Sequence, residues 1–200
     1  MATLNANAVI TQVEYLRAIG KSKDNPKIDN NQLIELINHA SDYLEEYLQR
    51  KVVAPASAIA ETITGISGPI YYVNNARITS VNTLEEFSRV DSDGAIEWDT
   101  RTVAERPYVF DEDKGEFEFV NGHEFYGGRW RLTYETGWAI ADVPGPIKTV
   151  AISLVQRMIK MMAGKDGVSS QNFGDQSTTY DLNQQLTNRH KMLLSRYRRI

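Results

Sequence analysis

Two spacings of acidic side chains in the middle of the sequence could support chemistry of their own. Asp91 with Asp93, and Asp111 with Asp113, hold carboxylates two residues apart, as the first ligands of a calcium-binding loop do. Neither pair is followed by the further acidic ligand, the glycine and the distal glutamate that complete such a loop. Both pairs are therefore interpreted as the solvated tips of hairpins.

Glu116 and Glu118 form the second spacing. They alternate with Phe117 and Phe119, so both carboxylates would lie on one face of a strand, where the acid pair of a glycosidase could stand. Alternation with a period of two is equally typical of any half-exposed strand, and this simpler interpretation is preferred. A small hydrolase that uses acidic residues of this segment stays open as an alternative.

The sequence offers few residues that could act as a catalytic nucleophile or as metal ligands. The sequence contains no cysteine and 3 histidines, which excludes thiol catalysis, disulfides and cysteine-ligated metal centres. Ser67 stands between glycines without the spacing of a nucleophile elbow, and His39, His123 and His190 do not share the spacing of a metal site. We therefore predict no enzymatic activity, no cofactor and no metal.

Charge and composition divide the 200 residues into three parts. Residues 1–51 carry 6 basic and 7 acidic side chains, residues 52–142 carry 7 and 16, and residues 143–200 carry 9 and 3. The middle part is also rich in aromatic residues, which favour strands. We predict an α+β chain: a helical bundle built from both chain ends (1–51 and 143–200), with an antiparallel β meander or small barrel inserted at 52–142.

Apolar residues that recur every three or four positions predict the helices. These are a short helix from Thr11 to Gly20, a longer one behind Asp29, one from Pro146 to Gly164, and a last one that Asp181 caps. The third is apolar on more than one face, through Met158, Met161 and Met162 at its end, so we expect it to be central and buried. A polar, glycine-bearing loop is predicted from Lys165 to Thr179.

Short runs bounded by turn residues predict strands at 70–73, 84–90, 108–110, 116–120 and 130–134. Trp130, Leu132 and Tyr134 alternate with polar residues, as in an edge strand or a strand with one buried face. Neither a secretory signal nor a membrane span is predicted, because the first basic residue is Arg17 and the most apolar stretch, 150–155, is short.

The C-terminal end is strongly basic, with Arg189, Lys191, Arg196, Arg198 and Arg199 in the last twelve residues and no acid among them. Three interpretations are open: contact with a protein partner, favourable capping of a helix end, and nucleic-acid binding. Protein contact is preferred, because the basic charge is confined to one end while the middle of the chain is acidic.

Short segments along nearly the whole chain carry a resemblance to a known family. In the first half they are 10–11, 33–41 with Tyr47 and Arg50, and 69–81; in the second half they are Tyr134 with 137–138, 143–144, 146–148, 167–170, 173–175, Tyr180, 193–194 and 197–199. With this layout the chain resembles the head-tail connector, or adaptor, family of tailed bacteriophages, whose members join the portal vertex to the neck and tail.

The resemblance implies a non-enzymatic structural protein of the virion, made in the host cytoplasm and placed in the neck between head and tail. It implies a ring, usually a dodecamer, that docks on the portal, extends the DNA channel and offers a surface to the next neck protein, a stopper or tail terminator. Double-stranded DNA would pass without sequence-specific binding, and no membrane is involved.

The same resemblance, together with the basic end, indicates which residues bind the portal or a neighbouring copy. The loop supplies three of them and the C-terminal end supplies the others. They are Phe173, Asp175, Tyr180, Arg189, Lys191, Arg196, Tyr197, Arg198, Arg199 and Ile200. A second alternative is a carbohydrate- or receptor-binding β module, for which Trp98, Trp130 and Trp138 would have to present flat, exposed rings.

Overall fold

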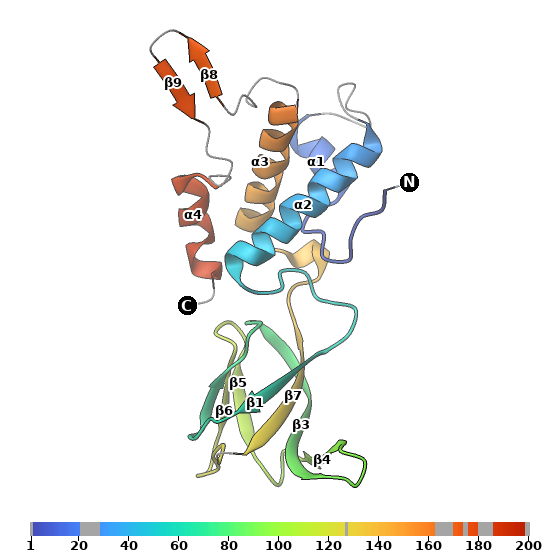
Figure 1. The fold of residues 1–200 in the computed structure, drawn as a ribbon, viewed down its shortest axis with the longest axis vertical. Helices are drawn as coiled ribbons and strands as arrows, with labels where there is room; N and C mark the ends of the chain where they lie inside the picture. The colour runs from blue at the N-terminus through green and yellow to red at the C-terminus, as the bar shows by residue number, and fades with distance from the viewer. Residues whose placement is uncertain are drawn as a thin grey trace. The chain divides into compact units, whose positions relative to one another are not determined.

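The computed structural model describes residues 2–20, 29–126, 128–162, 170–173, 176–179 and 186–198. The chain divides into two compact units (Figure 1). The helical unit combines Met1–Leu48 with Ala139–Ile200, and the strand unit is Gln49–Trp138. Helices and antiparallel strands make this an α+β chain, which confirms the predicted class. Among the described residues, no helix is both long and apolar enough to cross a membrane.

The helical unit begins with α1 (Gln12–Ala18) and α2 (Asn30–Leu48). A capping box starts α1: the Glu14 N–H donates to the Thr11 hydroxyl, and the Glu14 carboxylate accepts from the Thr11 N–H at 2.7 Å. Gly20, with φ of +73°, follows the end of the helix, in a conformation that glycine adopts without strain.

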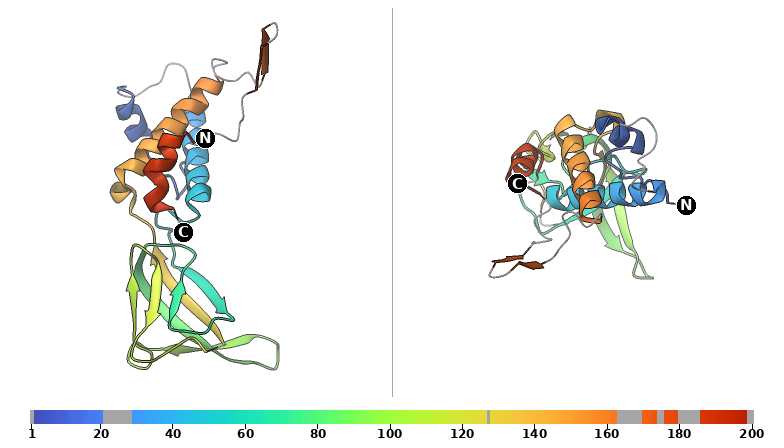
Figure 2. Two further views of the ribbon diagram at one scale, coloured as in Figure 1. Left: turned by 90° about the vertical axis from the view of Figure 1, so that its left-hand side faces the viewer. Right: turned by 90° about the horizontal axis from the view of Figure 1, so that it is seen from above.

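After the strand unit the chain continues with the short 3-10 turn η1 (Ile140–Asp142) and α3 (Gly145–Met162). The α2 and α3 helices pack against each other, and their apolar stripes form the core of the unit. Seen from above, α3 lies between α1 and α4 (Figure 2). The buried apolar side chains of the two long helices are Leu33, Ile37, Ala40, Leu44, Leu48, Ile147, Val150, Ala151, Leu154 and Val155.

The end of α3 differs from the sequence prediction. Met158 and Met161 are only half-buried and Met162 is 58% exposed, so the C-terminal end of this helix is not central. The prediction was wrong here because apolar residues on several faces can also mark a surface that stays open.

The last part of the chain also differs. Residues 170–179, predicted as a loop, contain the paired strands β8 (Ser170–Phe173) and β9 (Gln176–Thr179). The last helix, α4 (Asn188–Leu194), is capped by Thr187, and it continues into the 3-10 turn η2 (Ser195–Tyr197). The predicted cap, Asp181, lies outside the described residues.

In the described residues of the strand unit, seven strands form two antiparallel sheets. The order in the larger sheet is β1-β7-β3-β4, and in the smaller sheet it is β2-β6-β5. The strands are β1 (Ile59–Thr64), β2 (Ile70–Tyr72), β3 (Ile78–Val90), β4 (Ile96–Arg101), β5 (Tyr108–Asp111), β6 (Glu116–Phe119) and β7 (Arg129–Thr136).

The core of this unit is formed by inward side chains of both sheets. Phe117 and Phe119 come from β6, and Leu132 and Tyr134 come from β7. The described strands leave both sheets open, with β1 and β4 at the edges of the larger one, so the barrel alternative is wrong. The run at 130–134 has one buried face, as predicted, but belongs to the central strand β7 and not to an edge.

Candidate interaction surface at the C-terminal helix

The α4 helix is too short to be stable by itself, since isolated helices of its length are marginal in water. It is held against α3, which it contacts, by buried apolar side chains. Leu194 is fully buried and Leu186, just before the helix, is 4% exposed. The helix is thus a fixed platform on which its polar side chains are displayed.

Four of the predicted cations are exposed: Arg189 and Lys191 lie in α4, Arg196 lies in η2 and Arg198 follows it. The guanidinium carbon of Arg196 lies 4.6 Å from the centroid of the Tyr197 ring. That of Arg198 lies 5.2 Å from the ring of Tyr47 in α2. Such cation–π contacts orient a guanidinium without removing it from water, so both charges are held in place and remain exposed.

His190 completes the start of α4. Its backbone N–H donates to the Thr187 hydroxyl at 3.2 Å, and its ring nitrogen lies 3.4 Å from the Thr187 nitrogen. Burial lowers the pKa of His190, and the nearby charges of Arg157 and Arg189 lower it further. A neutral ring is what the cap requires, because the ring accepts a hydrogen bond there.

Tyr197 is placed differently from the other predicted binding residues. Its side chain is only 7% exposed, so in this structure it packs within the helical unit. The binding role predicted for Tyr197 remains a prediction that would require the ring to be released. The remaining predicted residues are less fully described: Asp175, Tyr180, Arg199 and Ile200 lie outside the described residues, and only the backbone of Phe173, in β8, is described.

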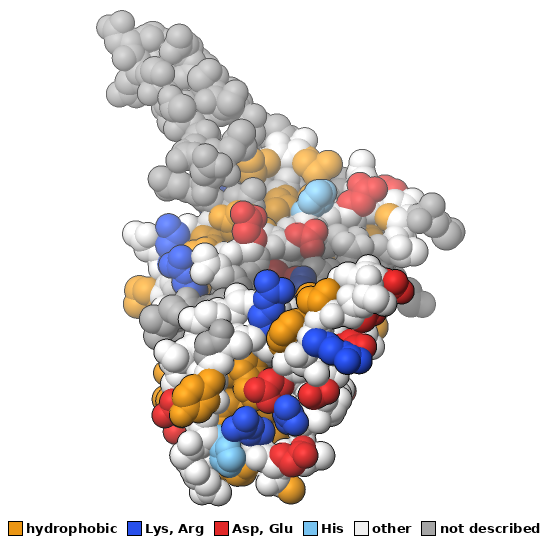
Figure 3. Space-filling view, turned by 60° about the horizontal axis from the view of Figure 1, so that its bottom comes forward, with side chains coloured by type: hydrophobic (Ala, Val, Ile, Leu, Met, Phe, Trp, Pro, Cys, Tyr) orange, Lys and Arg blue, Asp and Glu red, His pale blue; other side chains and the backbone are white. Residues whose placement is uncertain are grey.

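A groove that sequence reasoning missed lies on the helical unit, between α2 and the exposed end of α3. Its volume is about 510 Å³. On the face shown in Figure 3, hydrophobic side chains lie beside carboxylates across this unit. The methionine run at 158–162 was the available signal. The groove is lined by Leu36, His39, Asp42, Tyr43, Glu46, Met158, Met161 and Met162.

The aspartate pairs considered as calcium ligands instead accept hydrogen bonds from the backbone of the turns in which they lie. One Asp91 oxygen accepts from the N–H groups of Asp93 and Ala95 at 2.9 and 2.8 Å. One Asp111 oxygen accepts from those of Asp113 and Lys114 at 3.1 and 3.0 Å. These are hairpin-tip contacts. Within the described ranges, no three His, Cys, Asp or Glu residues are grouped so that they could hold a metal ion.

The geometry of the strand unit does not favour the hydrolase alternative or the carbohydrate-binding alternative. Glu116 and Glu118 pair in register with Tyr72 and Ile70 of β2 on the sheet face opposite the buried Phe117 and Phe119. Trp130 and Trp138 are buried, at 1% and 7% exposure. Trp98 is half-buried, with Arg131 stacked 4.9 Å from its ring and Phe87 against it edge-on. None of these three rings is a flat, exposed platform for a sugar.

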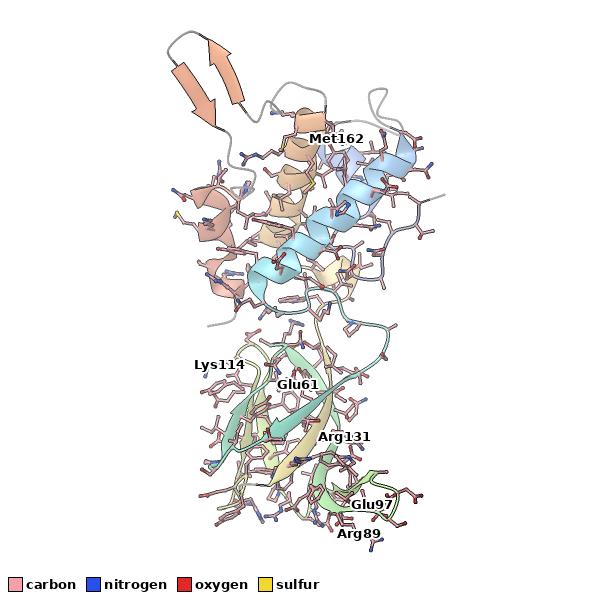
Figure 4. The ribbon with its side chains drawn as sticks, in the orientation of Figure 1. Glu61, Arg89, Glu97, Lys114, Arg131 and Met162 are labelled. Atoms are coloured by element: carbon pink, nitrogen blue, oxygen red, sulfur yellow. The ribbon has the colours of Figure 1, made fainter. Side chains whose placement is uncertain are left out.

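The labelled acidic and basic side chains of the strand unit form local pairs (Figure 4). Arg131 binds Glu85 through two hydrogen bonds of 2.6 and 2.7 Å, and Arg89 binds Glu97 at 2.6 Å. Glu61 is almost buried and accepts from the hydroxyls of Tyr134 and Tyr71. These are contacts within and between strands, and they converge on no open cavity that the described residues line.

Sequence comparison gives no relative: no family model matches this chain. No curated protein matches it either. Solved structures do match, over the whole chain. The match to a chain in "Neck of empty GTA particle computed with C6 symmetry" has a TM-score of 0.63 and 15% identity, and covers 100% of this chain and 94% of that chain.

Two further solved structures agree with the first. A chain in "Neck of native GTA particle computed with C12 symmetry" matches with a TM-score of 0.61 and 12% identity, and 93% of it is covered. A chain in "Virion of native gene transfer agent (GTA) particle" matches with a TM-score of 0.62 and 12% identity, and 94% of it is covered. All of this chain is covered in both matches. This chain therefore shares its fold with those chains.

Proposed function

We propose that this chain is a structural protein of the neck of a phage-like particle, whose copies form a ring between head and tail. The observation that carries the proposal is the fold match, which takes in 100% of this chain and 94% of a chain from a particle neck. The match therefore covers both the helical unit and the strand unit. The C6 and C12 symmetries of the matching necks support a ring. In this role the protein turns over no substrate.

The ring docks on the portal protein and continues the DNA channel toward the tail. Lys191, in α4, and Arg198, directly after η2, are both exposed cations of the C-terminal end. We assign them to the portal contact, together with Arg199 and Ile200. Phe173, Asp175 and Tyr180 are assigned to the portal or to the neighbouring copy.

The strand unit is suited to a channel through which DNA passes without being held. Residues 49–138 carry 15 acidic and 9 basic side chains, and negative charge repels the phosphate backbone. The ring would then offer its far side to the next neck protein, a stopper or tail terminator. Synthesis takes place in the host cytoplasm and the finished protein resides in the virion neck.

The test is to mix the purified protein with purified portal and to image the particles. A ring stacked coaxially on the portal ring is the expected result. Lys191→Glu with Arg198→Glu should abolish stacking, while the matched pair Arg17→Glu with Arg129→Glu, also exposed and equal in charge change, should leave it intact. Charge reversal is preferable to truncation, because truncation would also remove the buried Tyr197. No stacking by the unaltered protein would refute the proposal.

A further inference from the structure

The outward side of α4 carries an apolar side chain between two cations. Arg189 and Met192 are three residues apart in α4, so they lie on one side of the helix, and Arg196 follows in the 3-10 turn η2 that continues α4. Met192 is 77% exposed, and both arginines are exposed as well. Leu194, two residues after Met192, is buried on the opposite side of α4. We call Arg189, Met192 and Arg196 the outer stripe.

The groove between α2 and α3 has the complementary character. Leu36, Tyr43 and the three methionines give it an apolar floor. Asp42 and Glu46, both exposed, are four residues apart and therefore stand together along one edge of α2. No lysine or arginine is among the described residues that line it. The groove thus fits an apolar knob that carries positive charge on both sides.

The outer stripe cannot enter the groove of its own chain. The α4 helix packs against α3, with Leu194 buried, and α3 is itself one wall of the groove. The outer stripe faces away from that wall. A second copy can present its stripe without this constraint, and methionine adapts its shape to the surface it meets.

We infer that the α2–α3 groove of one copy receives the outer stripe of the next copy, with Met192 on the methionine floor and the two arginines against Asp42 and Glu46. Groove and stripe are different surfaces, so the contact is head-to-tail, which is the kind of interface that builds rings. The inference rests on the proposed function, in that the ring is where the copies meet. It uses Arg189 and Arg196, and leaves Lys191 and Arg198 to the portal.

The absence of cysteine from the sequence allows a direct test. A Met192→Cys variant is mixed with a Met162→Cys variant and treated with a short bismaleimide crosslinker. We expect a crosslinked heterodimer in at least about tenfold excess over the control mixture of Met192→Cys with Val13→Cys. Val13 is 64% exposed on α1 and lies on neither surface. Equal yields in the two mixtures would overturn the inference.

Charge-reversal variants test whether the crosslink depends on the predicted ion pairs or only on the two thiols lying near each other. Arg189→Glu with Arg196→Glu in the Met192→Cys chain should lower the yield about tenfold. Asp42→Lys with Glu46→Lys in the Met162→Cys chain should then restore it, and failure to restore would count against the pairing. If the thiol of the isolated Met162→Cys chain does not react with a monofunctional maleimide, the groove is filled by its own chain and the inference is wrong.

The outcomes also distinguish this inference from the proposed function. Coaxial stacking on the portal without the specific crosslink would sink the groove contact and leave the neck role standing. The specific crosslink without any stacking on the portal would leave the groove contact standing and sink the neck role.

Discussion

Glu61 occupies an inward position of β1, where an apolar residue would be usual, and it is 8% exposed. Its carboxylate accepts from the Tyr134 hydroxyl, from the Tyr71 hydroxyl at 3.1 Å, and from the Asn74 N–H at 3.0 Å. Burial, followed by the Glu61 carboxylate, raises the pKa of Tyr134, so its hydroxyl stays protonated as a donor. One buried carboxylate thus links both sheets of the strand unit.

Removal of this carboxylate should destabilise the strand unit. Glu61→Ala removes the acceptor of these three hydrogen bonds, and we expect a loss of about 2–3 kcal/mol. Tyr134→Phe removes one donor to Glu61 and the hydroxyl that accepts from the Asn75 N–H, and we expect a smaller loss of about 1 kcal/mol. Tryptophan fluorescence during urea unfolding measures it, since Trp98, Trp130 and Trp138 all lie in this unit. Equal stability of Glu61→Ala and the unaltered protein would contradict the role given to the carboxylate.

For single residues, the sequence predicts which charged side chains are exposed, but it does not predict which side chains bind one another. The exposure of Arg189, Lys191, Arg196 and Arg198 follows from charge alone. The partners of Glu61 could not be predicted, because Tyr71 is ten and Tyr134 seventy-three positions away. They meet only after the strands have paired.

At the scale of elements, α1 is joined to α3 by a partly buried ion pair. The Lys148 ammonium donates to the Glu14 carboxylate at 2.8 Å, with the side chains 18% and 33% exposed. Burial tends to raise the pKa of Glu14, but hydrogen bonds from Lys148 and Thr11 outweigh it, and the pKa is lowered below its usual 4.5. The pair therefore stabilises the folded helical unit when Glu14 is charged.

Lys148→Met should cost the helical unit about 1 kcal/mol near neutral pH. A lowered pKa means that the contribution is complete above the usual value of 4.5 and is lost as the pH falls through the lower folded value, so the deficit should shrink as the pH falls below 4.5. The helical circular dichroism signal during urea unfolding, recorded at several pH values, measures this loss of unfolding free energy. Lys160→Met, at an exposed position on the same helix, is the control, and a deficit independent of pH would contradict the pairing.

Elements were predictable where their periodicity was unbroken. The stripe of α2 and the alternation of β6 were both clear because each has one consistently buried face. The β1 strand was missed because its inward position 61 is a glutamate. The late start of α4 was missed because a Thr187 cap with His190 three residues on is a weaker signal than Asp181 followed by leucine.

At the scale of the whole molecule, the chain builds two units that each have a core of their own. The α-helices, α1 to α4, belong to the helical unit, and the three tryptophans belong to the strand unit. Circular dichroism of helices and tryptophan fluorescence therefore report on different units. This separation turns the two variants above into a test of how independently the units fold.

If each core stabilises only its own unit, each variant should destabilise the unit that contains it and leave the stability of the other unit unchanged. Glu61→Ala should lower the urea midpoint of the fluorescence transition and leave the helical transition in place, and Lys148→Met should do the reverse. Each transition should also have a smaller dependence on urea than a single unfolding of all 200 residues would have, because that dependence scales with the surface exposed. A common shift of both signals in both variants would mean that the two units unfold as one cooperative unit, whose helices cannot open without disturbing its strands.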